Sequence, residues 1–266
     1  MAPKITMNDP ADINWPIKPT IRSIAVHTWW LFSARPGTFF MLAFAAYLPV
    51  AVFPSLIRYS APDGPHALSL RLAFVAIGVV TQFLAAILIC AAHNTIVGKD
   101  NTLGSMLNPV LRRWAPLLLM FVVQSLIFSL IYVLATELLM SFLIPRISLV
   151  IICNILLGSF LGAAFSVSIP LCLIGEKGAI ASLKNSPTFI KGHFFKIFIL
   201  VALISLAGYY LQYMITTFLP GQLFFNIHLA ALPVAALFMA FEYVMFTVIY
   251  YDLADWRDVR LTEVFH

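Results

Sequence analysis

Long apolar runs make up most of the chain, and short polar stretches, most of them basic, separate these runs. Apolar stretches of about 18 residues or more recur, which is the length that a helix needs to cross roughly 30 Å of hydrocarbon. The runs lack the polar–apolar alternation of membrane β-barrels, so we expect helices. We predict an all-α, polytopic membrane protein with six transmembrane helices, at residues 39–56, 72–96, 115–140, 147–174, 194–218 and 227–251. Pro49 and Pro54 predict a kink or an early end in the first of them.

The composition supports a membrane protein. Of the 266 residues, 62% are hydrophobic and 10% are charged, whereas a soluble domain carries about a quarter charged residues. Cys90, Cys153 and Cys172 lie inside apolar runs and are expected to be small buried hydrophobes, with no metal site. The net charge of +5 indicates contact with anionic lipid headgroups rather than with nucleic acid. Residues 1–20 contain no apolar signal region, so we expect the first span to direct insertion.

The basic residues predict the orientation of the chain. Thirteen of the 16 lysines and arginines lie before the first span, after the second and fourth spans, or after the sixth. Short loops rich in lysine and arginine face the cytoplasm. We therefore predict a multi-pass protein of the bacterial inner membrane with both termini in the cytoplasm.

Three segments that precede the odd-numbered spans share a pattern. "TIRSIAVH", "TLGSMLNP" and "AIASLKNS" each contain an apolar residue, a spacer, a serine and another apolar residue, and the serines (Ser23, Ser105 and Ser182) are 82 and 77 residues apart. Such spacing indicates internal repeats. We predict a single membrane domain, 1–266, with pseudo-repeats at about 19–97, 101–174 and 178–252. Each would be a cytoplasmic amphipathic interfacial helix followed by a hairpin of two transmembrane helices. Alternatively, the segments are basic linkers of the kind that many membrane proteins have on this side.

The basic residues of these segments are candidates for contact with lipid headgroups. They are Arg22, Arg35, Arg112, Arg113, Lys184, Lys191 and Lys196.

The third segment resembles a known family. Residues 170–200, "PLCLIGEKGAIASLKNSPTFIKGHFFKIFIL", are similar to a segment of six-span bacterial and archaeal membrane proteins. This family includes the membrane domain of glycerophosphodiester phosphodiesterases and related uncharacterised inner-membrane proteins. The sequence Tyr250-Tyr251-Asp252-Leu253 is similar to the family's exit from the last span. The resemblance implies a membrane module with an accessory or organising role, since the phosphodiesterase chemistry belongs to a separate soluble barrel for which we expect no room here. The matching positions are Glu176, Gly178, Ser182, Leu183, Ser186, Lys191, Gly192 and Asp252.

Glu242 is the main candidate for intramembrane chemistry. It lies roughly 13 Å from the cytoplasmic end of the sixth span, at 1.5 Å per residue. A charge at that depth costs about 2.5–3.5 kcal/mol, so the residue is a functional candidate. It could instead be a protonated acid that joins two helices, for example through a hydrogen bond to Gln124. The cost of charging favours this structural interpretation. His93 is a further polar candidate near the cytoplasmic end of the second span, but the titratable groups form no continuous proton path.

Small residues predict a helix-packing face on the fourth span. Gly158, Gly162 and Ser166 recur at a spacing of four in "GSFLGAAFS", so they share one face. Such a face lets a second helix approach closely, either within the monomer or from another subunit.

The sequence contains no HExxH, GxSxG, Walker A or dinucleotide-binding motif. We therefore predict no enzyme and no cofactor. The leading hypothesis is an accessory or organising subunit that packs against membrane partners and anionic lipid. The alternative is a transporter or lipid-handling permease that uses Glu242 in an internal polar site.

Overall fold

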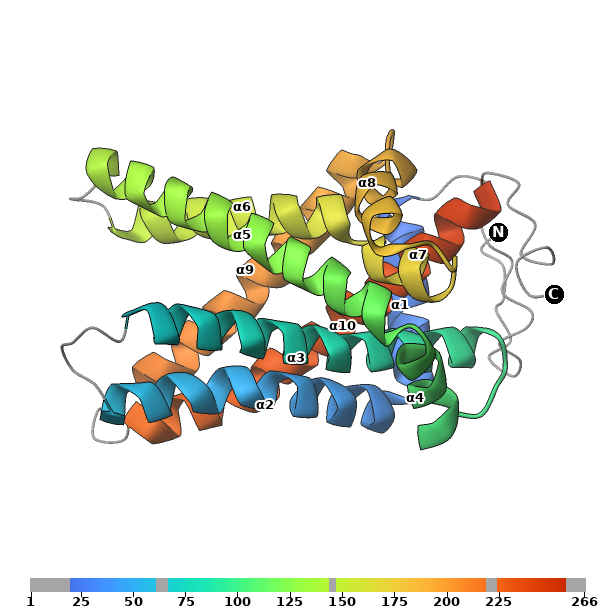
Figure 1. The fold of residues 1–266 in the computed structure, drawn as a ribbon, viewed down its shortest axis with the longest axis horizontal. Coiled ribbons are helices and arrows are strands. Elements are labelled where there is room, and N and C mark those ends of the chain that lie inside the picture. Colours follow the sequence, from blue (N-terminus) through green and yellow to red (C-terminus); the bar gives the residue numbers. More distant parts are fainter. Residues whose placement is uncertain (1–19, 61–66, 144–146, 219–223, 257–266) are drawn as a thin grey trace.

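The computed structural model describes residues 20–60, 67–143, 147–218 and 224–256. Ten helices occupy these ranges (Figure 1). They are α1 (Ile21–Ala34), α2 (Pro36–Ser60), α3 (Ala67–Ile96), α4 (Leu103–Arg112), α5 (Trp114–Leu143), α6 (Ile147–Phe165), α7 (Ser168–Leu173), α8 (Ala179–Phe189), α9 (Phe194–Phe218) and α10 (Phe224–Trp256).

Five of the described segments are long and apolar enough to cross a membrane. A sixth is obtained if α1 and the first part of α2, which meet at an angle of 94°, are counted as one broken span. The prediction of an all-helical, multi-pass chain is therefore confirmed. The five segments are Ala76–Ile96, Trp114–Ala135, Ile152–Leu173, Phe194–Ile215 and Ala231–Ala254.

Prolines set several helix boundaries. Pro36 begins α2, where its fixed φ suits the first helical position. The helix then continues through Pro49 and Pro54, so it does not end early. The fourth predicted span, in contrast, is divided between α6 and α7 at residues 166 and 167. Pro170 has no N–H to donate to the carbonyl of Ser166, and its ring crowds that carbonyl, which favours a break there.

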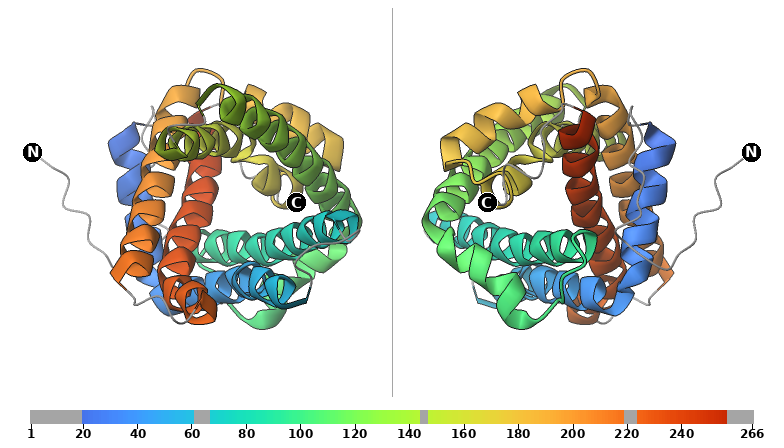
Figure 2. Two further views of the ribbon diagram at one scale, coloured as in Figure 1. Left: turned by 90° about the vertical axis from the view of Figure 1, so that its left-hand side faces the viewer. Right: turned by 90° about the vertical axis from the view of Figure 1, so that its right-hand side faces the viewer.

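Each long helix packs against the next long helix along the chain, and the last packs against the first, so the long helices form a ring. Successive contacts join α2 to α3, α3 to α5, α5 to α6, α6 to α9 and α9 to α10. The closing contact, between α10 and α2, brings the last helix against the first long one. Seen along the long axis, the helices are arranged around a common centre (Figure 2).

The short helices lie together at one end of the long helices, beside the C-terminal end of α10 (Figure 1). They follow the same cyclic order. α4 packs against α3, α8 packs against α5, α6 and α7, and α1 packs against α10. Each short helix therefore contacts the second long helix of the preceding pair, and α8 also contacts the first.

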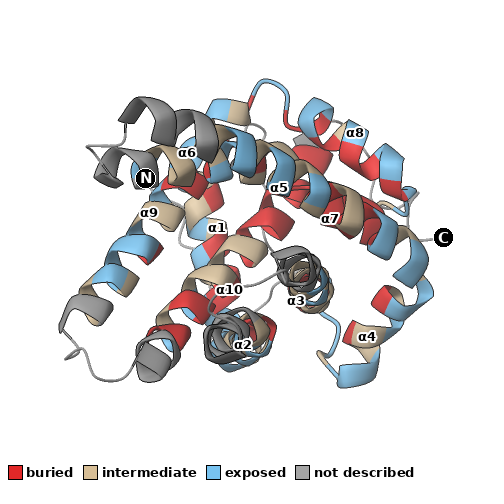
Figure 3. Cartoon of the chain, turned by 60° about the vertical axis from the view of Figure 1, so that its left-hand side comes forward, coloured by how far each residue is buried: buried red, intermediate tan, exposed pale blue. Residues whose placement is uncertain are grey.

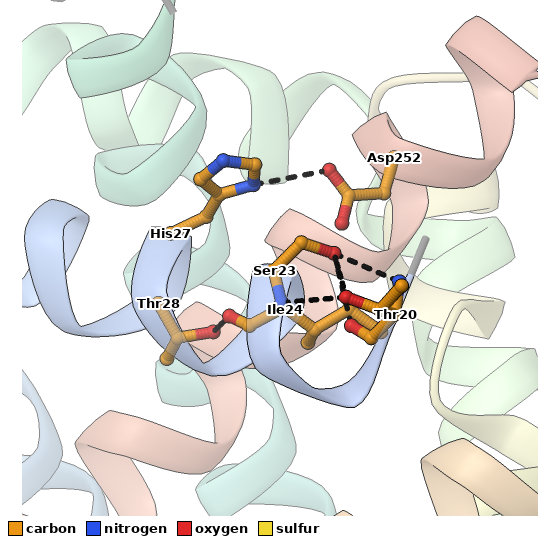
Figure 4. Close-up of polar contacts among 6 residues, drawn as sticks. All are labelled: Thr20, Ser23, Ile24, His27, Thr28 and Asp252. Carbon is orange, nitrogen blue, oxygen red and sulfur yellow. Dashed lines mark hydrogen bonds and ion pairs between the residues drawn. The ribbon is translucent and has the colours of Figure 1, made fainter. Parts of the chain in front are cut away.

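The recurring serine has two different roles. In α1, the Thr20 side chain accepts a hydrogen bond from the Ser23 N–H (3.0 Å) while the Ser23 hydroxyl accepts one from the Thr20 N–H (2.8 Å), a reciprocal cap (Figure 4). In α4, Thr102 accepts from the Ser105 N–H (3.2 Å). In α8 the N-cap is Gly178, and Ser182 is buried one position deeper in the helix. The serine thus donates its N–H to an N-cap threonine in α1 and α4, but not in α8.

The end that carries the short helices is the most deeply buried part (Figure 3). All six residues of α7 are buried, and so is every residue of α10 from Val244 to Ala254. A helix buried on all sides lies within a core rather than at its edge. The end of α10 is therefore the hub against which other helices pack.

Candidate functional site

The hub places three consecutive residues of α10 against three different helices. Tyr250 stacks on Phe189 of α8, with ring centroids 5.6 Å apart. Tyr251 contacts the Nδ1 of His93 on α3 through its hydroxyl, and the two rings are stacked. Because neighbouring residues on a helix point in different directions, one short stretch can join three elements.

Asp252 makes the third of these contacts. Its Oδ1 lies 3.4 Å from Nδ1 of His27 on α1 (Figure 4), and the aspartate side chain is completely buried. Asp252 and His93 were predicted as a family-motif residue and an intramembrane polar candidate. Both take part in contacts between helices, in which α1 and α3 are joined to the end of α10.

Arg113 forms a second junction, at the sharp bend between α4 and α5. Its Nη1 donates to the carbonyls of Cys172 (3.1 Å) and Lys177 (3.3 Å), and its Nη2 lies 3.4 Å from Oε2 of Glu176. Glu176 adopts a φ of 49°, in the left-handed region that favours glycine. Arg113 was expected to face lipid headgroups, but its guanidinium instead holds the loop between α7 and α8.

The remaining motif residues position α8. The Ser186 hydroxyl donates to the carbonyl of Ala164 on α6 (2.9 Å), and Ser182 and Leu183 are buried on the same side. Gly192 has a φ of +91°, which only glycine adopts readily, in the turn that leads from α8 to α9. Gly178 caps the start of α8. These residues determine how α8 packs against its neighbours.

Glu242 lines a cavity of about 340 Å³ that is a groove between helices, more open than enclosed. Side chains from four helices line this cavity. Among the described residues, no hydrogen bond or ion pair reaches the Glu242 carboxyl, and the Thr81 hydroxyl is buried in the same wall without a hydrogen-bond partner. The polar lining residues are Tyr47 (α2), Thr81 (α3), Ser205, Tyr209 and Gln212 (α9), and Glu242 and Tyr243 (α10).

Gln124 does not take part in this site. It is buried in α5, it does not line the Glu242 cavity, and its carbonyl oxygen accepts no hydrogen bond within the described ranges. The expected hydrogen bond between Gln124 and Glu242 is therefore absent. The helices that carry them belong to different sides of the ring, a separation that depth along a span does not reveal.

The small residues of α6 form a packing face only in part. A methyl group built on Gly162 would lie 3.5 Å from Val201 of α9 and 3.9 Å from the Glu242 Oε1, so this glycine does face other helices. A methyl group on Gly158 would meet nothing within 4 Å. Ser166 is buried, at the break before α7. Gly158 therefore admits no close helix within the described part of the monomer, and a contact with another subunit stays a prediction.

Gly208 of α9, unlike Gly158, lies in close contact with another helix. A methyl group at Gly208 would lie 3.2 Å from the Phe238 ring of α10. We expect Gly208→Ala to lower the free energy of unfolding by about 1–3 kcal/mol through overpacking. Gly158→Ala is the matched control and should leave stability unchanged or raise it by up to about 1 kcal/mol, since alanine suits a helix better than glycine. Unfolding by sodium dodecyl sulfate in mixed micelles measures both, and equal effects would contradict the prediction.

A basic pocket lies at the other bend, between α1 and α2. Arg35 from this bend and Lys99 from the turn after α3 both line a cavity of about 370 Å³. Lys99 is exposed and Arg35 is partly exposed. Trp30, Ser33, Ala34, Thr95 and Gly98 complete the lining.

The other predicted headgroup contacts lie on the outside of the short-helix end. Arg22, Arg112, Lys184 and Lys191 are exposed, and Lys196 is partly exposed. Large apolar side chains are exposed beside them, on the same helices or at the bends that follow. These are Ile21, Val26 and Trp29 of α1, Leu103 and Leu111 of α4, Trp114 at the start of α5, and Ile180 of α8.

Comparison with known proteins yields no relative: no family model matches the chain, and no curated protein or solved structure does either. The resemblance to the six-span family therefore remains a prediction. Across the described residues, no group of three histidine, cysteine, aspartate or glutamate side chains could hold a metal ion.

Two parts of these sites were missed by reasoning from the sequence. His27 was not singled out, because a lone histidine on an apolar helix gives no sign of a partner 225 residues away. Lys99 was noted only as one of the charges that orient the chain. A signal for it exists, however: Gly98-Lys99 and Gly175-Glu176 are 77 residues apart, the same spacing as Ser105 and Ser182.

Proposed function

We propose that this chain is a non-enzymatic, multi-pass protein of the bacterial inner membrane whose short-helix end lies at the cytoplasmic surface. There it binds anionic lipid and packs against other membrane proteins as an accessory or organising subunit. The observation that carries the proposal is the side-by-side exposure of large apolar and basic side chains on α1, α4 and α8.

Exposed apolar residues of this size call for a non-aqueous surrounding. Trp29 is 63% exposed, Leu103 70% and Ile180 57%. Burying such a side chain is worth about 1.5–3 kcal/mol, and the headgroup boundary supplies that burial. Arg22, Arg112 and Lys184 on the same helices would then meet anionic headgroups, each contributing about 1 kcal/mol near the surface.

The cyclic packing order supports the interpretation of the chain as three repeats. The proposed placement of all three short helices at one membrane surface requires such repeats. Each pair of long helices would be a hairpin with both ends at one surface, and each short helix would lie at that surface. The contacts of α1 with α10, α4 with α3, and α8 with α6 and α7 are equivalent under this scheme. A repeated unit explains why three segments with weak sequence similarity pack in equivalent positions.

Purification from native membranes in a mild detergent tests the proposal. We expect anionic lipid and stoichiometric partner subunits to co-purify, as read by native mass spectrometry. A triple variant with Arg22→Gln, Arg112→Gln and Lys184→Gln should retain less anionic lipid. The control exchanges Arg22→Lys, Arg112→Lys and Lys184→Arg, which keeps the charges. A lone monomer without a preference for anionic lipid would overturn the proposal.

The Glu242 cavity favours a second candidate function, the transport or handling of a solute or lipid. An acid with no partner in the described protein, surrounded by hydroxyl, amide and phenol groups, is the lining expected of an internal polar site. The three-repeat order is a parallel arrangement, although many transporters are built from inverted repeats.

Access of water to Glu242 discriminates between this candidate and a dry helix contact. In a background without native cysteines, we expect Glu242→Cys to react readily with a small, charged, water-soluble thiol reagent, because the residue borders the cavity. Thr247→Cys, fully buried one and a half turns further along α10, is the control and should remain unmodified. Modification kinetics followed by mass spectrometry provide the measurement. A Glu242→Cys variant as unreactive as the control would exclude an internal polar site.

A further inference from the structure

The bends before α2 and α5 are built alike. Arg35 is the C-cap residue of α1, and Arg113 is the C-cap residue of α4. Each arginine lies next to the loop that follows the second long helix of its own pair: the turn after α3 for Arg35, and the loop after α7 for Arg113. The two arginines therefore occupy equivalent positions.

The bend at Arg113 is closed by the protein itself. Two backbone carbonyls accept hydrogen bonds from the guanidinium, and Glu176 supplies a negative charge 3.4 Å away. A guanidinium with these partners has its charge compensated by a carboxylate, and its Nη1 group donates to two carbonyls. This site is therefore less favourable for an anion than a pair of uncompensated cations.

The bend at Arg35 differs from the bend at Arg113 in the sign of one charge. Gly98 corresponds to Gly175, the glycine that precedes Glu176, so Lys99 occupies the position that Glu176 occupies at the other bend. Two cations consequently line one cavity, and in the described part of the chain no ion pair involves either of them. Like charges on one small site repel each other, and an anion placed between them removes that repulsion.

We propose that the Arg35–Lys99 pocket binds a phosphate group, carried either by the headgroup of an anionic lipid or by a soluble phosphate ester. An arginine fork and a lysine point charge are a usual pair of phosphate ligands. The cavity, at about 370 Å³, has room for a phosphate and the group esterified to it. Trp30 in the lining is a residue type enriched at the membrane interface. As a lipid site, the pocket rests on the proposed contact with anionic lipid; as a soluble phosphate site it does not.

Two probes distinguish the two sources. The detergent-purified full chain is titrated with inorganic phosphate and followed by thermal unfolding. Separately, it is mixed with equal amounts of phosphatidylglycerol and phosphatidylcholine, and the retained lipid is counted by native mass spectrometry. Retention of phosphatidylglycerol without a phosphate effect assigns the pocket to a lipid headgroup. Stabilisation by phosphate without lipid preference assigns it to a soluble phosphate and removes support from the proposed function.

Lys99→Glu is the decisive variant, because it recreates the arginine–glutamate pair found at the other bend and so should preserve the fold. We expect it to weaken binding of whichever probe the wild type binds by at least about tenfold, since like charges at a binding site are strongly unfavourable. Arg35→Gln is a second variant with the same expected direction. Lys177→Glu makes the same charge change at an exposed residue in the loop after α7, outside the pocket, and should have a much smaller effect.

The inference is overturned if neither probe binds, or if Lys99→Glu and Lys177→Glu behave alike. In the latter case the wild type would still prefer anionic lipid through its general surface charge. The proposed function would then stand while the specific pocket would not.

Discussion

Replacing Arg113 by glutamine is expected to lower the free energy of unfolding by about 2–4 kcal/mol, because hydrogen bonds to a charged group are worth roughly 1.5–3 kcal/mol and their loss leaves carbonyls unpaired. The guanidinium bonds the carbonyls of Cys172 and Lys177 and pairs with Glu176. Its removal disconnects the bend between α4 and α5 from the loop that leads to α8. Unfolding by sodium dodecyl sulfate in mixed micelles measures the effect.

The neighbouring residue provides the control. Arg112 is exposed, and no described hydrogen bond or ion pair involves it. Arg112→Gln removes the same charge at almost the same place and should leave stability unchanged. Arg113→Lys keeps the charge but lacks the planar fork, so it should recover only part of the loss. Equal effects of Arg113→Gln and Arg112→Gln would show that the guanidinium contacts contribute nothing.

Replacing His27 by leucine is expected to destabilise the protein by about 1–3 kcal/mol, because removing one partner from a buried polar contact costs about this much. Asp252 is fully buried and lies 3.4 Å from the His27 ring. The double variant His27→Leu/Asp252→Leu should regain most of the loss, since apolar residues often replace a buried pair without cost. Double-mutant cycles from the same unfolding assay give the coupling free energy.

His27→Leu combined with Gln124→Leu serves as the reference cycle. Gln124 lies on α5, which is not among the principal neighbours of α1. The two effects should add to within about 0.5 kcal/mol, as they do for distant sites. If the His27 and Asp252 effects are equally additive, then the contact does not join α1 to α10 energetically.

The helices were largely predictable from the sequence, because hydropathy reports residence in a non-aqueous surrounding. Hydropathy also explains why the contacts between helices could not be predicted. Lipid tails are as apolar as leucine, so hydropathy does not distinguish a lipid-facing residue from a buried one. Gly158, which faces open space, and Gly208, which faces Phe238, look alike in the sequence. The pairing of helices around the ring therefore had to come from the structure.

The candidate sites could likewise be predicted only in part from the sequence. Glu242 was found from the sequence because a charge inside an apolar run is conspicuous, whereas its cavity draws on four helices and leaves no local pattern. Arg113 and Arg35 have the same sequence signature, a basic residue between a short segment and a long apolar run. Only their partners separate an internally satisfied guanidinium from one that lines a pocket with Lys99. The position of an arginine in the sequence does not reveal which distant loop its side chain contacts.

The packing of α1 against α10 has a consequence for biogenesis. The ribosome produces α1 before α10, yet α1 packs against α10 in the finished protein. Until α10 has been made, the face of α1 that carries Ile24, Leu31 and Phe32, all buried in the finished protein, lacks one of the helices against which it packs. The final packing of α1 is therefore reached only after the synthesis of α10.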